Sequence, residues 1–236
     1  MNDKELFFER GFTNNIKVEL GQKLTQLQSL VYDLTKDLLI EHDSNQPIKQ
    51  KIKLPFKTVP RGDSWSKIMN TVNESIQLKD VISSDEIKNT FKRIFSKPVL
   101  FEISAFRARF PEQSRVLYNW HQDEGTWFLS KKKNVTEKFP ATLWLSINGS
   151  DEKNSIQVVG NTHKLKLFNH QWVDGQGFFK INNINKMIKE DDIHTVKTEE
   201  SECLIFHPLT IHRSVPVSEN IDLRPRYSLD IRYFDD

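Results

Sequence analysis

The pair His121 and Asp123, within the segment Trp120–Gly125 (WHQDEG), is the strongest chemical signal in this sequence. Residues two apart on a strand point to the same side, so at the end of a strand this imidazole and this carboxylate could reach one point. One histidine and one carboxylate leave a divalent metal under-coordinated, and a third ligand would have to come from elsewhere in the fold. Two histidines and one carboxylate on one face of an octahedron form the site of non-haem Fe(II) oxygenases. By itself, such a pair is a weak signal, and it is more often a hydrogen-bonded histidine than a metal site.

Three later segments bear on this pair. They are residues 154–164 (NSIQVVGNTHK), 206–214 (FHPLTIHRS) and 224–233 (RPRYSLDIRY). Together with the WHQD tetrapeptide, and in this order, they resemble the phytanoyl-CoA dioxygenase family, a branch of the Fe(II)/2-oxoglutarate oxygenases. The resemblance covers roughly residues 98–234, and the first third of the chain is similar only in being helical. The chain departs from the family pattern at Val159, where the family has proline, and at Asn154-Ser155, where it has Asn-Gly.

The resemblance implies a metal centre and a cosubstrate site. It assigns His121, Asp123 and His212 as ligands of Fe(II), and Arg226 with Ser214 as the residues that hold the remote carboxylate of 2-oxoglutarate. Arginine suits this role because it stays charged and offers two parallel donors. The implied reaction uses O₂, converts 2-oxoglutarate to succinate and CO₂, and hydroxylates a substrate. Related halogenases have a small residue in place of the carboxylate, so the presence of Asp123 makes hydroxylation the default, with desaturation or ring chemistry as alternatives.

Two residues rival these assignments. Arg224 competes with Arg226, but it would lie at the start of a strand, where exposure to solvent is usual. His207 competes with His212, but it precedes Pro208 and lacks a serine two residues later. We therefore interpret His207 as a histidine of a strand end or loop.

Further side chains are candidates with a structural alternative. Trp144 corresponds to a tryptophan that the family places beside the cosubstrate, and it fits a core position equally well. His163 matches a histidine that is usually structural in the family. Arg107, like Arg109, could reach an anionic group of the substrate or emerge into water at a strand end. Trp127 could line the mouth of the pocket, or could be an ordinary core or surface aromatic.

Two other classes of protein are compatible with parts of this pattern. A cupin-like metal enzyme would use similar ligands without 2-oxoglutarate, but it would have no dicarboxylate for Ser214 and Arg226 to hold. A non-catalytic binding barrel would have lost its metal, although all three ligand residues are present here. The substrate is indicated by no motif, and we expect a small polar metabolite or a natural-product intermediate.

The first third of the chain is predicted to be helical. Leucine and valine residues recur at steps of three and four, which places them on one stripe of a helix over residues 16–40. A proline-containing connector is predicted over 43–63. A second helix is predicted over 64–78, and a third begins after Ser83, which has capping-box spacing with Glu86, and ends before Pro98.

From residue 99 the apolar pattern takes a period of two, which is typical of strands. Strands are predicted at residues 99–106, 115–120, 125–129, 141–147, 155–159, 177–181, 194–197, 202–207, 213–217 and 227–234, with one helix over 183–189. Many short strands indicate a sandwich or barrel, and the resemblance makes it a double-stranded β-helix of the jelly-roll or cupin type. We therefore predict a mainly β fold buttressed by N-terminal helices, as one domain over residues 1–236 with a helical part at 1–97 and the barrel at 98–236.

Composition argues against several partners. The 34 basic and 32 acidic residues give a net charge of +2, which predicts no general attraction to nucleic acid or membranes. The run Lys131–Lys133 is interpreted as a solvated loop. Cys203 is the single cysteine, which excludes an intramolecular disulfide and a cysteine-based zinc site. No apolar run approaches the roughly 20 residues that span a bilayer. We expect a cytoplasmic monomer or homodimer that acts on a small molecule.

Overall fold

The computed structural model describes residues 1–40, 45–57, 62–101, 104–109, 119–126, 140–173, 178–184, 187–216 and 224–236. The α-helices are α1 (Asp3–Arg10), α2 (Gln22–Thr35), α3 (Ile48–Lys51), α4 (Gly62–Glu74), α5 (Ile76–Ile82) and α6 (Asp85–Lys92). The strands are β1 (Phe12–Lys17), β2 (Pro98–Leu100), β3 (Ala105–Arg109), β4 (Ala141–Ser146), β5 (Ile156–Val159), β6 (His170–Val173), β7 (Phe178–Ile181), β8 (Ile193–Thr195), β9 (Glu202–Phe206), β10 (His212–Ser214) and β11 (Arg226–Asp235). Short 3₁₀ helices are η1 (Lys36–Leu38), η2 (Thr162–Lys164) and η4 (Glu190–Asp192).

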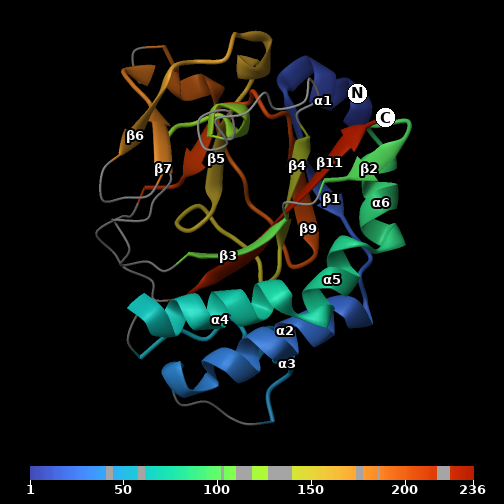
Figure 1. Ribbon diagram of the computed structural model, residues 1–236, viewed down its shortest axis with the longest axis vertical. Coiled ribbons are helices and arrows are strands. Elements are labelled where there is room, and N and C mark those ends of the chain that lie inside the picture. The colour runs from blue at the N-terminus through green and yellow to red at the C-terminus, as the bar shows by residue number, and fades with distance from the viewer. Residues whose placement is uncertain are drawn as a thin grey trace.

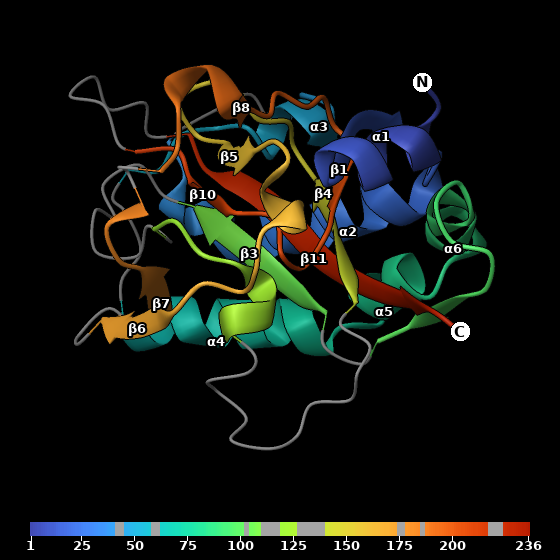
Figure 2. The same ribbon diagram turned by 90° about the horizontal axis from the view of Figure 1, so that it is seen from above.

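Antiparallel pairing joins these strands into sheets. The large sheet has the order β1-β9-β4-β11-β2, and β3 also pairs with β11. A second sheet has the order β10-β5-β8, and β6 and β7 form a hairpin. The hairpin lies at the opposite end of the molecule from α6 (Figures 1 and 2). The fold is thus a combination of N-terminal helices and antiparallel sheets.

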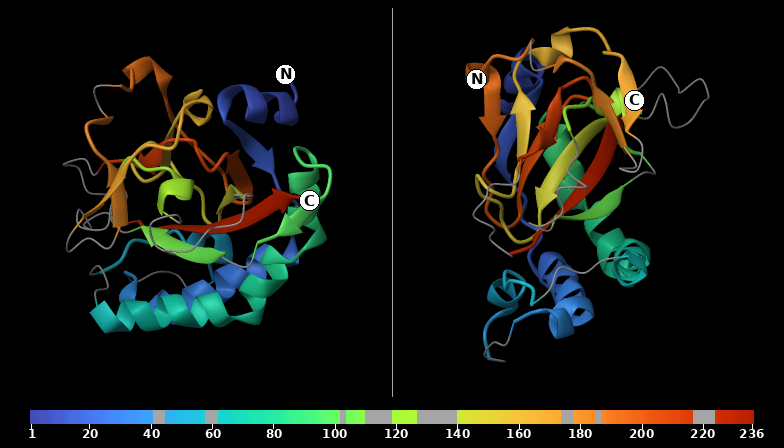
Figure 3. Two further views of the ribbon diagram at one scale, coloured as in Figure 1. Left: turned by 45° about the horizontal axis from the view of Figure 1, so that its top comes forward. Right: turned by 90° about the vertical axis from the view of Figure 1, so that its left-hand side faces the viewer.

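The helices cover one face of the large sheet (Figure 3). Leu24, Leu27 and Val31 lie on one stripe of α2 and are buried in a shared core with residues of β4, β9 and β11. On β11 that core takes every second residue, namely Tyr227, Leu229, Ile231 and Tyr233. Burial of these apolar faces is the main driving force that fixes the helices against the sheet.

The opposite face of the large sheet packs on the three-stranded sheet. Trp144 of β4 and Leu204 and Phe206 of β9 share a buried cluster with Ile156 and Val158 of β5. The alternate residues of β11, namely Arg226, Ser228, Asp230 and Arg232, have the same strand parity and point to this second face. A polar set is therefore enclosed between two sheets, where side chains are held rigidly.

Several predicted helix boundaries were wrong. Residues 12–17 form strand β1 on the edge of the large sheet, so the helix predicted from residue 16 begins at Gln22. The helix predicted over 64–78 is two helices, because the Ser75 side chain accepts a hydrogen bond from the N–H of Leu78 and caps α5. Ile76, at the start of α5, is exposed. Ser84, not Ser83, caps α6, and the short helix α3 lies inside the predicted connector.

The strands after residue 140 agree well with the prediction. Strands β4, β5, β7, β9 and β11 coincide with predicted strands within one to two residues, and β8 and β10 are shorter than predicted. The strand predicted over 99–106 is divided into β2 and β3, and β6 was not predicted. Of the strand predicted at 125–129, residues 125 and 126 are helical and the others lie outside the described residues. Of the strand predicted at 115–120, residues 115–118 also lie outside them. The described part of 183–189 contains no α-helix.

Within the described residues, no helix has the length and apolar character needed to cross a membrane.

Candidate metal centre

His121 and His212 are brought together by their backbones. The N–H of each residue donates to the carbonyl oxygen of the other, at 3.0 Å in both directions. Residues that exchange both hydrogen bonds lie directly opposite each other across an antiparallel pair. The two imidazole rings are consequently neighbours, with centroids 4.1 Å apart.

Asp123 reaches the same point from a different local structure than predicted. Residues 123–126 form a short helical turn, in which the N–H of Thr126 donates to the carbonyl of Gln122 at 3.2 Å. The strand geometry that was expected to align His121 with Asp123 is therefore absent, because the chain turns immediately after the bridge between the two histidines. The convergence itself is confirmed.

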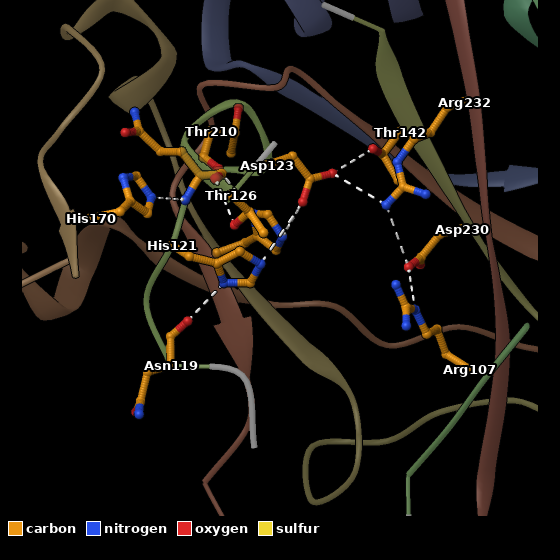
Figure 4. Close-up of polar contacts among 12 residues, drawn as sticks. Arg107, Asn119, His121, Asp123, Thr126, Thr142, His170, Thr210, Asp230 and Arg232 are labelled. Atoms are coloured by element: carbon orange, nitrogen blue, oxygen red, sulfur yellow. Dashed lines mark hydrogen bonds and ion pairs between the residues drawn. The ribbon is translucent and has the colours of Figure 1, made fainter. Parts of the chain in front are cut away.

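Three ligand atoms of these residues face one another. The Oδ1 atom of Asp123 lies 3.8 Å from Nε2 of His121 and 3.5 Å from Nε2 of His212. One ligand atom from each residue lies within 4.8 Å of the other two, and all three side chains are buried. Figure 4 shows the two residues of the WHQD segment directed toward this common point.

The hydrogen bond made by Nδ1 of each ring indicates which nitrogen carries the proton. Nδ1 of His121 lies 2.7 Å from the carbonyl oxygen of Asn119, and Nδ1 of His212 lies 3.0 Å from that of Thr210. A carbonyl oxygen only accepts, so Nδ1 carries a proton in both rings, and Nε2 has a lone pair whenever the ring is neutral. Two lone pairs and one carboxylate oxygen then face each other, which is a donor set suited to a divalent cation.

Burial keeps His121 neutral. Loss of solvent, followed by the proximity of His212, lowers the pKa of His121 to about 3. An imidazole in this state is available as a metal ligand at neutral pH, because no proton has to be displaced from it first.

The second oxygen of Asp123 is held away from this point. Oδ2 accepts a hydrogen bond of 2.7 Å from the Thr142 hydroxyl, and the buried guanidinium of Arg232 lies 3.7 Å from it. Burial by itself raises the pKa of the Asp123 carboxyl, but His212 and the positive charge of Arg232 outweigh burial and hold that pKa below its usual range. The carboxylate is therefore ionised, with Oδ1 directed at the histidines (Figure 4).

A second group of contacts holds the WHQD segment in place. The N–H of Gln122 donates to Nε2 of His170 at 2.9 Å, and Nδ1 of His170 donates to the carbonyl of Phe168 at 2.7 Å. The Gln122 side chain is fully buried and donates to the carbonyl of Leu209 at 2.8 Å. Gly125 lies under the His170 ring, where a Cβ atom would come within 2.2 Å of Cε1. The segment before the turn is thus tied to two distant parts of the chain.

Arg226 is buried at the start of β11 and stacks beside Trp144. Its guanidinium carbon lies 5.1 Å from the centre of the Trp144 ring, and Nη1 donates to the Ser228 hydroxyl at 2.9 Å. Its rival Arg224 is exposed and lies 3.8 Å from a carboxylate oxygen of Asp151. The contrast in burial agrees with the preference for Arg226 as the inward-facing cation.

Ser214 has the strand parity expected from His212. It is buried at the end of β10, two residues after His212. Among the described residues, no hydrogen bond joins Ser214 to Arg226, so the structure does not bring this predicted pair into direct contact.

Arg107 and Trp127, the two candidates for substrate contact, and the lysine run have different outcomes. Arg107 pairs with Asp230 at 2.9 Å, and Asp230 also lies 3.7 Å from Arg232. Trp127 and Lys131–Lys133 lie outside the described residues.

The rival ligand His207 and His163 form a separate pair. Their rings lie 5.5 Å apart, Nδ1 of His207 accepts from the N–H of Leu209 at 3.1 Å, and Nε2 of His163 lies 2.9 Å from the carbonyl of Phe8. Neither belongs to the cluster of ligand atoms found among the described residues. The structural interpretation of both histidines agrees with these contacts.

Sequence reasoning missed Thr142, Arg232, Gln122 and His170. Two of them had a signal: Thr142 shares strand parity with Trp144, and Arg232 shares it with Arg226, so each could have been assigned to the inner face. Gln122 and His170 gave no comparable signal, because their contacts join segments that are distant in sequence.

The chain was compared with known proteins. A family profile described as phytanoyl-CoA dioxygenase (PhyH) matches residues 4–221. No curated protein matches the chain.

Solved structures with a similar fold include three proteins of low sequence identity. The apo form of ThoJ, described as a non-heme monooxygenase, is 14% identical, with 98% of this chain and 76% of that chain covered and a TM-score of 0.63. EvdO2 from Micromonospora carbonacea var. aurantiaca, complexed with 2-oxoglutarate, is 13% identical, with 99% and 90% covered and a TM-score of 0.59. SnoK, a non-heme alpha ketoglutarate dependent carbocyclase from nogalamycin biosynthesis, is 12% identical, with 99% and 83% covered and a TM-score of 0.62. At such identities the likeness concerns the fold.

Proposed function

The chain belongs to the phytanoyl-CoA dioxygenase family, and from this premise we propose that it is a non-haem Fe(II)- and 2-oxoglutarate-dependent oxygenase that hydroxylates a small molecule. The observation that carries the proposal is the convergence of two imidazole Nε2 atoms and one carboxylate oxygen in a buried site. The opposite side of each of these groups is tied to the protein, so the three donor atoms can serve a metal together.

We assign the metal to His121, Asp123 and His212. Iron bound there would supply O₂ activation coupled to the decarboxylation of 2-oxoglutarate to succinate and CO₂. The protein residues supply the orientation: Asn119 and Thr210 fix the tautomers of the two rings through their carbonyl oxygens. The charge of Arg232 helps to keep Asp123 ionised, and the hydrogen bond from Thr142 holds its second oxygen, so that a single oxygen would face the metal.

We assign the remote carboxylate of 2-oxoglutarate to Arg226, with Trp144 and Ser214 beside it. Arg226 is a buried cation whose Nε has no hydrogen-bond partner among the described residues. A buried guanidinium of this kind is costly unless an anion accompanies it, and a carboxylate that accepts parallel hydrogen bonds fits it well. The solved structure of EvdO2 in complex with 2-oxoglutarate supports a cosubstrate site in this fold.

The proposal extends to the architecture of the fold and to the class of substrate. We propose that the two facing sheets form a double-stranded β-helix and that the chain is one domain, with the N-terminal helices as its outer layer. A natural-product substrate is supported by two relatives of similar fold. SnoK is described as a carbocyclase from nogalamycin biosynthesis, and the epimerase SnoN is described in complex with Fe³⁺, alpha ketoglutarate and nogalamycin RO. Arg107 and Trp127 stay candidates for contact with that substrate.

Succinate formation tests the proposal. Wild-type protein with Fe(II), O₂ and 2-oxoglutarate should release succinate, and the rate should rise with the correct substrate in a screen of small molecules. The Asp123→Ala variant should release none above background. Iron uptake without any succinate would favour a cupin-like enzyme that does not use 2-oxoglutarate, and the absence of iron uptake would favour a binding barrel.

The choice of arginine has its own test. Arg226→Gln should raise the concentration of 2-oxoglutarate needed for half-maximal turnover by at least about tenfold, because it removes a charge-assisted pair of hydrogen bonds. Arg224→Gln is the matched control, since Arg224 is exposed and lies next to Asp151. Equal effects of the two substitutions would contradict the assignment of Arg226.

A further inference from the structure

Two buried arginines lie directly opposite each other at the end of the polar face. In the antiparallel pairing of β3 with β11, the Cα partner of Arg226 is Arg109, and the two strands run side by side in Figure 2. Directly paired residues on neighbouring strands place their side chains on the same face of the sheet, and like charges in this position destabilise a sheet. Arg109 is 7% exposed and Arg226 is 5% exposed, so water does not screen them effectively.

Neither guanidinium has a carboxylate partner in the part of the chain that the structure describes. Among the described residues, no carboxylate oxygen lies within ion-pair distance of Arg109 or Arg226, and the Nε atom of each is buried without a hydrogen-bond acceptor. Two carboxylates act on the pair from beyond ion-pair distance: Asp151 raises the pKa of Arg109, and Asp230 raises that of Arg226. Within the described ranges, two adjacent positive charges are therefore left without an adjacent negative charge.

The contacts that Arg109 does make orient its guanidinium without neutralising it. Nη1 donates to the carbonyl of Ser155 at 3.2 Å, and Nη2 donates to the carbonyl of Val215 at 2.5 Å. Burial lowers the pKa of Arg109 to about 10, and burial together with the charge of Arg109 lowers the pKa of Arg226 to about 9. Arginine stays protonated at neutral pH. The lowered pKa values therefore mean that burial and mutual repulsion make the charged state of the two arginines energetically unfavourable.

We propose that Arg109 is a second cation for the remote carboxylate of 2-oxoglutarate, so that an arginine pair from β3 and β11 holds this group. The inference rests on the proposed function and extends it by one binding residue. An anion between the two guanidiniums offsets their repulsion and their burial together. A carboxylate suits the position because Arg226 and Arg109 both have a buried Nε–H without an acceptor, and because the carboxylate brings the negative charge that backbone carbonyls lack.

A purely structural role for Arg109 makes a different prediction. Its bonds to Ser155 and Val215 join β3 to β5 and to the segment after β10. If Arg109 only joins these segments, its loss would weaken the binding of any ligand in the site. If Arg109 binds the remote carboxylate, its loss would weaken only the binding of ligands that have this carboxylate.

The experiment compares two 2-oxo acids of equal chain length. 2-Oxopentanoate ends in a methyl group where 2-oxoglutarate has its remote carboxylate. Calorimetric titration of each compound into Fe(II)-loaded protein without oxygen gives the preference for the dicarboxylate as a ratio of dissociation constants. Arg109→Gln should lower this ratio about 10- to 100-fold and leave the affinity for 2-oxopentanoate close to that of wild type, because one charged hydrogen-bonding partner is lost. Arg226→Gln should lower the ratio at least as much, and Arg224→Gln should leave it unchanged.

The possible results separate this inference from the proposed function. A wild-type protein without preference for 2-oxoglutarate contradicts the proposed function itself. A wild-type preference that Arg109→Gln fully retains overturns the arginine pair alone, as does an equal loss of affinity for both acids. If Arg109→Gln does not fold, Arg109→Met, which keeps the aliphatic stem, is measured in the same way. Arg109→Lys should recover part of the preference, since it restores the charge but not the planar donors.

Discussion

The backbones of His121 and His212 exchange two hydrogen bonds of 3.0 Å, so the two imidazoles are positioned by main-chain pairing and not by their side chains alone. A metal site on such a bridge is preorganised, because the ring spacing is set before any ion binds. The energetic consequences of this arrangement can be measured.

His212→Ala should remove iron binding while the bridge, which depends on main-chain atoms, is retained. We expect the iron content of protein purified without oxygen to fall from about one per chain to near zero, an affinity loss of at least about 100-fold, since loss of a ligand should exceed the effect of losing a supporting residue. His194→Ala, at an exposed position on β8, is the control. Undiminished iron content in His212→Ala would rule out this ligand.

Thr142→Val should weaken the metal site through Asp123. The substitution is nearly isosteric but removes the donor that lies 2.7 Å from Oδ2, so the carboxylate loses one of the contacts that hold its orientation. Metal affinity should drop about 10- to 100-fold, as measured by competition with a chelator. Thr195→Val on β8 is a matched control, because its hydroxyl accepts from Gln157. An affinity equal to that of wild type would show that Thr142 has no positioning role.

Gly125→Ala should destabilise the protein through His170. The added Cβ would approach the imidazole to 2.2 Å, and the ring cannot turn away without breaking its hydrogen bonds to Gln122 and Phe168. The free energy of unfolding should decrease by about 1–3 kcal/mol, as is typical of overpacking. In the Gly125→Ala, His170→Ala double variant the two effects should be less than additive by about 0.5–3 kcal/mol, since His170→Ala removes the ring that the added Cβ would meet. Additive effects in urea unfolding would contradict the contact.

Stability should fall in acid in a manner that depends on His207. Burial, and then the charge of His163, lowers the pKa of His207 to about 4, whereas an unfolded chain has a histidine pKa of about 6.5. The unfolded state therefore binds more protons between these values, so stability is fully present above pH 6.5 and is lost as the pH falls toward 4. With allowance for the partial exposure of the ring, the loss is about 1–2 kcal/mol.

His207→Asn isolates that contribution. Asparagine retains an acceptor near the position of Nδ1 but does not titrate, so the metal-free variant should lose less stability than wild type between pH 7 and pH 4. Unfolding in urea at a series of pH values measures the difference. A stability gap between the two proteins that stays constant over this pH range would contradict the assigned shift.

The site was predictable where it follows strand periodicity. Arg226, Ser228 and Trp144 lie on strands with regular alternation, so their common face could be read from the sequence once the strands were placed. His121 and Asp123 converge as predicted, although for another reason: a main-chain bridge followed by a helical turn replaces the expected strand end. The convergence was predicted correctly but from the wrong geometry, because the turn after the bridge directs Asp123 to the two histidines without strand alternation.

Other features depend on contacts between distant segments. The start of α2 at Gln22 could not be read from the leucine pattern, since Ile16 fits that stripe but is recruited by pairing of β1 with β9. His170 supports the WHQD segment from β6, and no local pattern records that contact. Tertiary pairing overrides local periodicity in both cases.

The division of β11 into two faces also constrains how this enzyme can change. Alternate residues of the strand serve the active site and the core under the helices, with Arg226, Ser228, Asp230 and Arg232 on one face and Tyr227, Leu229, Ile231 and Tyr233 on the other. A one-residue insertion or deletion within the strand would exchange the two faces, directing arginines at the helices and aromatic rings at the metal site. Neither chemistry nor stability could survive such an event. Evolution of a new substrate range, or its design in the laboratory, must therefore act on other walls of the site, and length variation among homologues should be missing from this strand.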